Sequence, residues 1–236
     1  MKILIQIFLA LLCVSAFAQT KTTAQKQKPE VQYTESFDQE NCHFTTSSIH
    51  TYFFLRPGYQ SVFREVEGKD TTEVTITVLK DTKAIGTTET RVIEERESVN
   101  GKLREVSKNY VAVCRESGSI FYFGEDVDNY KGDSIVSHSG SWLAEGKNKP
   151  GVMMPGTPLL GGRYYQEMAP GVAMDRAEII SMSDTVETPA GTFGNVLKIL
   201  ETTPLEPKDK SYKYYAPRIG LIKDGNLVLV KYGVIH

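Results

Sequence analysis

The feature that most constrains the fold is an alternation of apolar and polar residues that begins near residue 52. The stretch "EVTITVL", residues 73–79, places Val and Ile side chains on one face of an extended chain and Glu and Thr on the other. This period of two is typical of a β-strand with one buried and one solvated face. The sequence therefore predicts a sheet that covers a core.

Turn signals separate the alternating runs. Asn100-Gly101 is the strongest of them, because both central residues of a type I′ turn need positive φ. Further turns are expected at Asp224-Gly225, Lys131-Gly132-Asp133 and Pro189-Ala190-Gly191. Residues 173–182 fit either a short helix or a strand. The sequence predicts an all-β antiparallel meander of about ten to twelve strands.

The N-terminus has the features of a secretory signal. Residues 1–18 combine Lys2, an apolar stretch and a small-x-small motif that ends at Ala18, which predicts cleavage after that residue. Residues 19–36 are polar and are expected to form a flexible leader, and residues 37–236 a single β domain. The apolar stretch is too short to span a bilayer, so we expect a secreted or periplasmic protein with no transmembrane segment.

The charge balance limits the partners. The chain has 27 basic and 29 acidic residues and a formal net charge of −2, with both signs evenly mixed. A nucleic-acid-binding surface needs clustered positive charge, which is missing here. We therefore expect no nucleic acid partner. The oligomeric state is left open by the sequence.

Two cysteines, Cys42 and Cys114, remain after removal of the signal. Two cysteines in an exported protein, an even number, predict one disulfide. The alternative is that Cys42 and His43 form a nucleophile and its base. Neighbouring residues of an extended chain point to opposite faces, which is unfavourable for proton transfer between them. The disulfide is the preferred interpretation.

The chain also contains a weak internal repeat. Residues 85–93 align with residues 190–199, and the aromatic and glycine positions that follow each stretch align as well. This pattern predicts two similar halves, residues 52–132 and 151–233. Because glycine and tyrosine are common in β proteins, the pattern does not establish a duplication.

Four carboxylates lie among aromatic residues in "YFGEDVDNYKGD", residues 122–133. In an extended chain Tyr122, Asp126 and Asp128 share one face, and the two aspartates could bind Ca²⁺. The spacing is not that of an EF-hand. Glu125, Asp126 and Asp128 could also supply the carboxylate pair of a glycosidase. The structural alternative is that these acids mark the solvated end of a strand.

His138 and Trp142 follow in "HSGSW", where the tryptophan could stack on a sugar or fill the core. The candidate ligand-binding residues are Tyr122, Glu125, Asp126, Asp128, His138 and Trp142, and the candidate metal ligands are Asp126 and Asp128. No motif for an activated nucleophile or a phosphate loop is present in the sequence. We therefore expect no catalytic residue, and no cofactor other than calcium.

Several strings occur in one order over residues 50–233, including "YFGEDVDNY", "HSGSW", "TPAGTF" and "KYYAPRIGLIKDG". Together they resemble a family of exported bacterial all-β proteins that carries no assigned activity. "TPAGTF" followed by "YYAPRIGLIK" is distantly similar to the lipoprotein-carrier, LolA-like, half-barrels. That resemblance implies a curved antiparallel sheet around an apolar groove. The chain departs from it in having two apparent copies of this pattern, and the string "YYAP" is intact only in the second copy.

These observations favour a non-enzymatic, half-barrel-like protein that binds an apolar or amphipathic ligand, such as a lipid or a lipoprotein, in the groove of its sheet. This function rests on analogy of fold. One alternative is a cell-envelope hydrolase or a calcium-dependent glycan binder that uses Glu125, Asp126 and Asp128. Another is an envelope interaction module without a small ligand.

Overall fold

The computed structural model describes residues 31–235 and confirms the all-β prediction. The described chain contains no α-helix and one short 3-10 helix, η1 (Gln39–Asn41). Residues 173–182, which fitted a helix or a strand, contribute to a long strand. The expected signal peptide and residues 19–30 of the expected leader lie outside the described residues.

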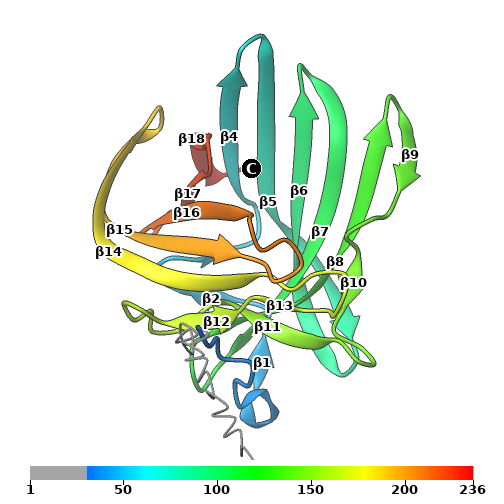
Figure 1. Ribbon diagram of the computed structural model, residues 1–236, viewed down its shortest axis with the longest axis vertical. Helices are drawn as coiled ribbons and strands as arrows, with labels where there is room; N and C mark the ends of the chain where they lie inside the picture. Colours follow the sequence, from blue (N-terminus) through cyan, green and yellow to red (C-terminus); the bar gives the residue numbers. More distant parts are fainter. Residues whose placement is uncertain (1–30, 236) are drawn as a thin grey trace, which may run out of the picture. The chain divides into compact units, whose positions relative to one another are not determined.

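Two runs of consecutive antiparallel strands form most of the sheet (Figure 1). The first run consists of β4 (Tyr59–Glu67), β5 (Asp70–Ile85), β6 (Thr88–Val99), β7 (Lys102–Cys114) and β8 (Ile120–Lys131). The second consists of β14 (Arg176–Thr188), β15 (Gly191–Thr202), β16 (Lys210–Ala216), β17 (Gly220–Asp224) and β18 (Leu227–Val234). β18 pairs with β4 and joins the two runs.

Short strands complete the fold. They are β1 (Phe44–Thr45), β2 (Ser48–Ile49), β3 (Phe54–Leu55), β9 (Ser134–Ser137), β10 (Trp142–Leu143), β11 (Lys149–Met154), β12 (Arg163–Tyr165) and β13 (Glu167–Met168). β2 and β3 form a separate two-stranded sheet. The described strands number eighteen, more than the sequence predicted, because several contain only two to four residues.

Residues 163–168 nearly close the large sheet into a barrel. β12 pairs with β14 at one end of the strand order, and β13 pairs with β11 at the other. Gln166 lies between them, and its buried side chain donates from Nε2 to Glu201 at 2.9 Å. Gly151 allows this approach, since a Cβ there would lie 2.2 Å from the carbonyl oxygen of Gln166.

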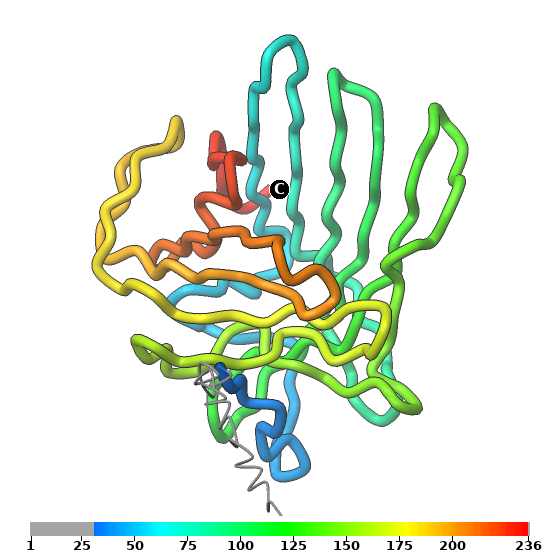
Figure 2. Tube along the Cα trace, in the orientation of Figure 1, coloured from blue at the N-terminus to red at the C-terminus, as the bar shows by residue number. Residues whose placement is uncertain are grey.

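The predicted turns join strands as expected. Asn100 and Gly101 have φ of 52° and 73° and connect β6 to β7. The turns at residues 131–133 and 189–191 connect β8 to β9 and β14 to β15. The β17–β18 loop is centred one residue later than predicted, because Asp224 pairs with Leu227. Figure 2 shows the β4–β5, β6–β7 and β8–β9 hairpins extending in one direction.

The N-terminal segment is attached to the sheet by the predicted disulfide. Cys42 is bonded to Cys114 at the end of β7, with their Cα atoms 5.0 Å apart. Phe44 packs edge-on against Phe121 and Phe123 of β8, at 5.4 and 5.2 Å between ring centroids. Because Cys42 is in a disulfide, it is not available as the nucleophile of the alternative interpretation.

Part of the expected leader is described and lies on the edge strand β12. The backbone N–H of Thr34 donates to the carbonyl of Arg163, and that of Tyr165 donates to the carbonyl of Thr34, both at 3.0 Å. Residues 31–36 therefore include a backbone contact with the sheet.

The internal repeat falls at equivalent points of the two runs of strands. Residues 85–93 cross the turn from β5 into β6, and residues 190–199 cross the turn from β14 into β15. This position is compatible with two similar halves, and the duplication stays a prediction. Residues 31–235 contain no helix that is long and apolar enough to cross a bilayer.

Candidate ligand-binding cavity

A β-bulge in β8 directs Tyr122 and Glu125 to the same face of the sheet. Tyr122 pairs with Val111 and Glu125 with Asn109, so residues 123–124 together lie opposite the single residue between them on β7. A bulge of this kind inserts one extra residue and reverses the alternation beyond it. Both side chains therefore line the interior of the barrel.

Gly124 makes the bulge possible. Its φ is 123°, a conformation that L side chains rarely adopt, and a Cβ there would lie 2.2 Å from the carbonyl oxygen of Trp142. The expectation that Tyr122 shares a face with Asp126 and Asp128 is wrong, because it assumed an uninterrupted strand. Glu125 is the acid that faces inward.

A cavity of about 300 Å³ lies inside the barrel. The apolar part of its lining comes mainly from β4, β5 and the segment before them, and includes Phe53, Phe54, Phe63, Ile76, Val78 and Leu221. The charged part comes from β6, β7, β8, β13 and β16 and consists of Glu95, Glu105, Glu125, Glu167 and Lys213, and Tyr215 of β16 lies beside it. The cavity is therefore amphipathic.

Burial raises the pKa of the lining carboxyls. The pKa of Glu95 and that of Glu125 rise to about 7, and that of Glu167 to about 8. In each case burial is the main cause, and neighbouring carboxylates add to it. All three side chains are half-buried, because the barrel wall surrounds them while each keeps part of its surface toward the cavity.

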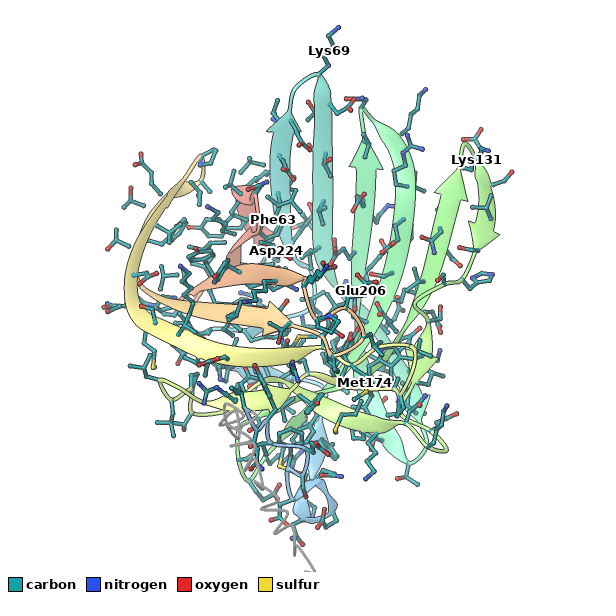
Figure 3. All side chains as sticks on the ribbon, viewed as in Figure 1. Phe63, Lys69, Lys131, Met174, Glu206 and Asp224 are labelled. Carbon is teal, nitrogen blue, oxygen red and sulfur yellow. A yellow bond between two sulfur atoms is a disulfide. The ribbon has the colours of Figure 1, made fainter. Side chains whose placement is uncertain are left out.

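Lys213 is the one basic residue among the described residues that line the cavity. Its Nζ lies 3.1 Å from Oε2 of Glu201 and 3.5 Å from Oδ2 of Asp224, which is labelled in Figure 3. Burial alone lowers the pKa of a lysine, but these carboxylates outweigh it and raise the pKa of Lys213 well above its usual value. The positive charge of Lys213 is thus already compensated by the carboxylates of Glu201 and Asp224.

Two tyrosines differ in how their hydroxyls are used. Tyr122 donates to Oδ1 of Asn109 at 2.5 Å. Tyr215 is only 4% exposed and lines the cavity, and its hydroxyl has no hydrogen-bond partner within residues 31–235; the oxygen is not among the fully enclosed unpartnered atoms, so it is open to the cavity. A buried phenol normally finds a partner. The Tyr215 hydroxyl is therefore free to contact a molecule in the cavity.

The remaining predicted site residues lie outside the cavity lining. Asp126 accepts hydrogen bonds from Lys83 Nζ at 2.8 Å and from the Tyr110 hydroxyl at 2.5 Å. Asp128 lies 2.9 Å from Nδ1 of His138. The structure therefore separates Glu125 from the two aspartates that the sequence grouped with it.

Trp142 is buried beside Tyr122 but is not part of the cavity lining. Its ring packs edge-on against Tyr122 at 5.4 Å between centroids, and it is only 4% exposed. Its Nε1 has no hydrogen-bond partner within the described chain. Of the two roles expected for this residue, the geometry corresponds to packing in the core.

Calcium binding by Asp126 and Asp128 stays a prediction. In the part of the chain that the structure describes, the one group of three side chains close enough to share a metal ion is Cys42, Cys114 and Glu116. Its two sulfurs are joined in the disulfide, so they are not thiolate ligands.

Sequence reasoning missed Glu95, Glu105, Glu167 and Lys213. A signal for Glu95 was present, because this residue lies two positions after Ile93 and so on the same face of the predicted strand. Glu167 and Lys213 carried no such signal, because their approach depends on closure of the barrel.

Comparisons of the chain with protein-family models, curated proteins and solved structures gave no match. The fold and the cavity define its class: an all-β, antiparallel, nearly closed barrel with an amphipathic interior.

Proposed function

We propose that the protein binds a small amphipathic ligand inside its barrel, without catalysis. The observation that carries this proposal is the cavity of about 300 Å³, which is lined both by apolar side chains of β4 and β5 and by polar side chains of β6, β7 and β8. Small-molecule sites are typically concave and mainly apolar, with a few polar groups that orient the ligand. The volume is at the lower end for such sites and favours a single short chain or ring.

The similarity of sequence strings to the LolA-like half-barrels agrees with an apolar or amphipathic ligand. We further propose that the protein is secreted or periplasmic, and the Cys42–Cys114 disulfide supports this, because disulfides persist in oxidising compartments. A hydrolase or glycan site made of Glu125, Asp126 and Asp128 is less favoured, since Glu125 alone of the three lines the cavity.

Tryptophan fluorescence tests the proposal. Trp142 is the only tryptophan and contacts Tyr122 of the cavity wall, so a ligand in the cavity should change its emission. We expect a saturable change when octanol is added to the wild type. Ser61→Phe should abolish it by filling the cavity, whereas Val62→Phe, on the opposite face of β4, should not. A non-saturable response, or one equal in Ser61→Phe, would contradict binding inside the barrel.

A further inference from the structure

The charges around the cavity indicate what head group the ligand carries, an inference that rests on the function proposed above. Glu95, Glu125 and Glu167 line the cavity, and none of the three forms an ion pair with any residue in the range 31–235. Lys213 is already paired with two other carboxylates. The one positive charge that the described residues place on the polar side of the cavity is therefore already compensated by other carboxylates.

Cross-strand pairing concentrates the acids further. Glu97 of β6 is directly paired with Glu105 of β7, and Glu95 lies two residues from Glu97 on the same face of the strand. Like charges directly opposite each other destabilise a sheet. Carboxylates kept out of water also cost free energy unless a cation or a proton compensates them. A bound cation would relieve both costs.

The free hydroxyl of Tyr215 is a second, independent indication of a ligand. It lies in a side chain that is 4% exposed, on the strand that also carries Lys213, across the barrel from β6 and β7. A phenolic oxygen can accept a hydrogen bond from an ammonium group. Tyr215 and the three glutamates thus offer only acceptors, or groups that can accept, to a ligand.

We propose that the barrel binds a protonated amphipathic amine, with its ammonium group among Glu95, Glu125, Glu167 and the hydroxyl of Tyr215 and its apolar body against Ile76 and Val78. An ammonium group has three donors and no acceptor, which matches this lining. Charge-assisted hydrogen bonds to carboxylates are also stronger than neutral ones. An anionic head group would meet repulsion on this side of the cavity.

The affinity should rise with pH. The titratable groups around the site are Tyr59 of β4, Glu95 and Glu97 of β6, Glu105 of β7, Tyr122 and Glu125 of β8, Glu167 of β13, Asp175 before β14, Glu201 of β15, Lys213 and Tyr215 of β16, and Asp224 of β17. An alkylamine stays protonated up to about pH 10, like a lysine. The protonated amine binds the ionised form of the carboxylates. Because the population of that form increases between about pH 5 and about pH 8, the affinity for the amine increases over the same range.

Calorimetric titration of the full mature protein with octylamine, octanol and octanoate tests the inference. The three probes share one chain and differ in head-group charge. At about pH 8 we expect octylamine to bind at least about tenfold more tightly than octanol, and octanoate more weakly than both. Glu95→Gln should remove about tenfold of the octylamine affinity, while Glu94→Gln, on the opposite face of β6, should leave it unchanged. Glu125→Gln and Tyr215→Phe provide further variants if Glu95→Gln does not fold.

The outcomes separate the head group from the function. Equal affinity for octylamine and octanol, or tighter binding of octanoate, would overturn the amine and leave the cavity as a binding site. Equal octylamine affinity of the wild type and the folded Glu95→Gln, Glu125→Gln and Tyr215→Phe variants would also overturn it. Absence of binding for all three probes would overturn both the amine and the proposed function.

Discussion

Ile76 and Glu95 are paired directly across β5 and β6, and both side chains line the interior cavity. The boundary between the apolar and the acidic part of the lining therefore runs between two adjacent strands. Because side chains alternate along each strand, the register that buries Ile76 also places Glu95 inside. The acids of the cavity are thus a consequence of the same pairing that forms the core.

The stability of the fold should decrease as pH rises. The folded-state pKa is about 7 for Glu95 and Glu125 and about 8 for Glu167, against 4.5 without burial. Between these limits the folded protein binds more protons than the unfolded chain, so the free energy of unfolding falls with rising pH. We expect the free energy of unfolding to be larger at about pH 5 than at about pH 8, by roughly 1 kcal/mol for each carboxyl, and the melting temperature to be higher accordingly.

His50 acts in the opposite direction, because burial lowers its pKa from 6.5 and its contribution is lost as pH falls. The carboxyls outnumber it, and Glu167→Gln should flatten the pH dependence measured by thermal denaturation. Glu67→Gln, which changes an exposed acid of β4, should preserve it. A wild type that becomes more stable on going from about pH 5 to about pH 8 would contradict burial of these acids.

Removal of the Lys213 ammonium should be strongly destabilising. Lys213→Met leaves the buried carboxylate of Glu201 and that of Asp224 without their cation. Breaking one side of a buried ion pair typically costs about 3 kcal/mol or more. Urea denaturation near neutral pH should show this loss, whereas Lys210→Met, an exposed change on the same strand, should cost less than about 0.5 kcal/mol. Similar losses for both variants would show that the pairing contributes little.

Gly124 should tolerate no side chain. In Gly124→Ala the new Cβ would lie 2.2 Å from the Trp142 carbonyl and 2.8 Å from the Cα of Leu143, at a φ of 123°. We expect a loss of about 3 kcal/mol or more in the free energy of unfolding. Gly132→Ala, also at positive φ but with open space around it, should cost only about 1 kcal/mol. Equal costs would mean that the backbone at the bulge can relax.

Reduction of the disulfide should lower the melting temperature by several degrees. Cys42 and Cys114 are separated by 72 residues, and closing a loop of that length contributes about 4 kcal/mol in the chain-entropy model. The double variant Cys42→Ser, Cys114→Ser should melt at the same lowered temperature, with or without reductant. An unchanged melt of the reduced wild type, with two free thiols counted, would contradict a stabilising role.

The strands and turns could be predicted from the sequence because their signals are local. The alternation in residues 73–79 predicts β5, and the Asn100-Gly101 pair predicts the β6–β7 turn through its backbone conformation. The disulfide followed from the number of cysteines and the expected compartment. Each of these features depends on a few neighbouring residues or on composition.

The cavity could not be predicted, because it depends on contacts between distant parts of the chain. The bulge at Gly124 exists where β10 approaches β8, and a single inserted residue exchanged the roles of Glu125 and Asp126. Closure brings Glu167 of β13 to the same cavity as Glu95, and it depends on the absence of a side chain at Gly151. Apart from the glycines themselves, nothing in the neighbouring sequence indicates the bulge at Gly124 or the closure at Gly151.

Native mass spectrometry tests most directly whether the barrel holds a ligand. The wild type, Ser61→Phe and Val62→Phe would be purified from the cells that produce the protein and sprayed under gentle conditions, and any bound molecule would then be extracted and identified. We predict one small molecule per chain, an amphipathic amine, on the wild type and on Val62→Phe, and none on Ser61→Phe. A ligand-free mass for the wild type under conditions that preserve the fold, or equal loading of Ser61→Phe, would contradict a binding site inside the barrel.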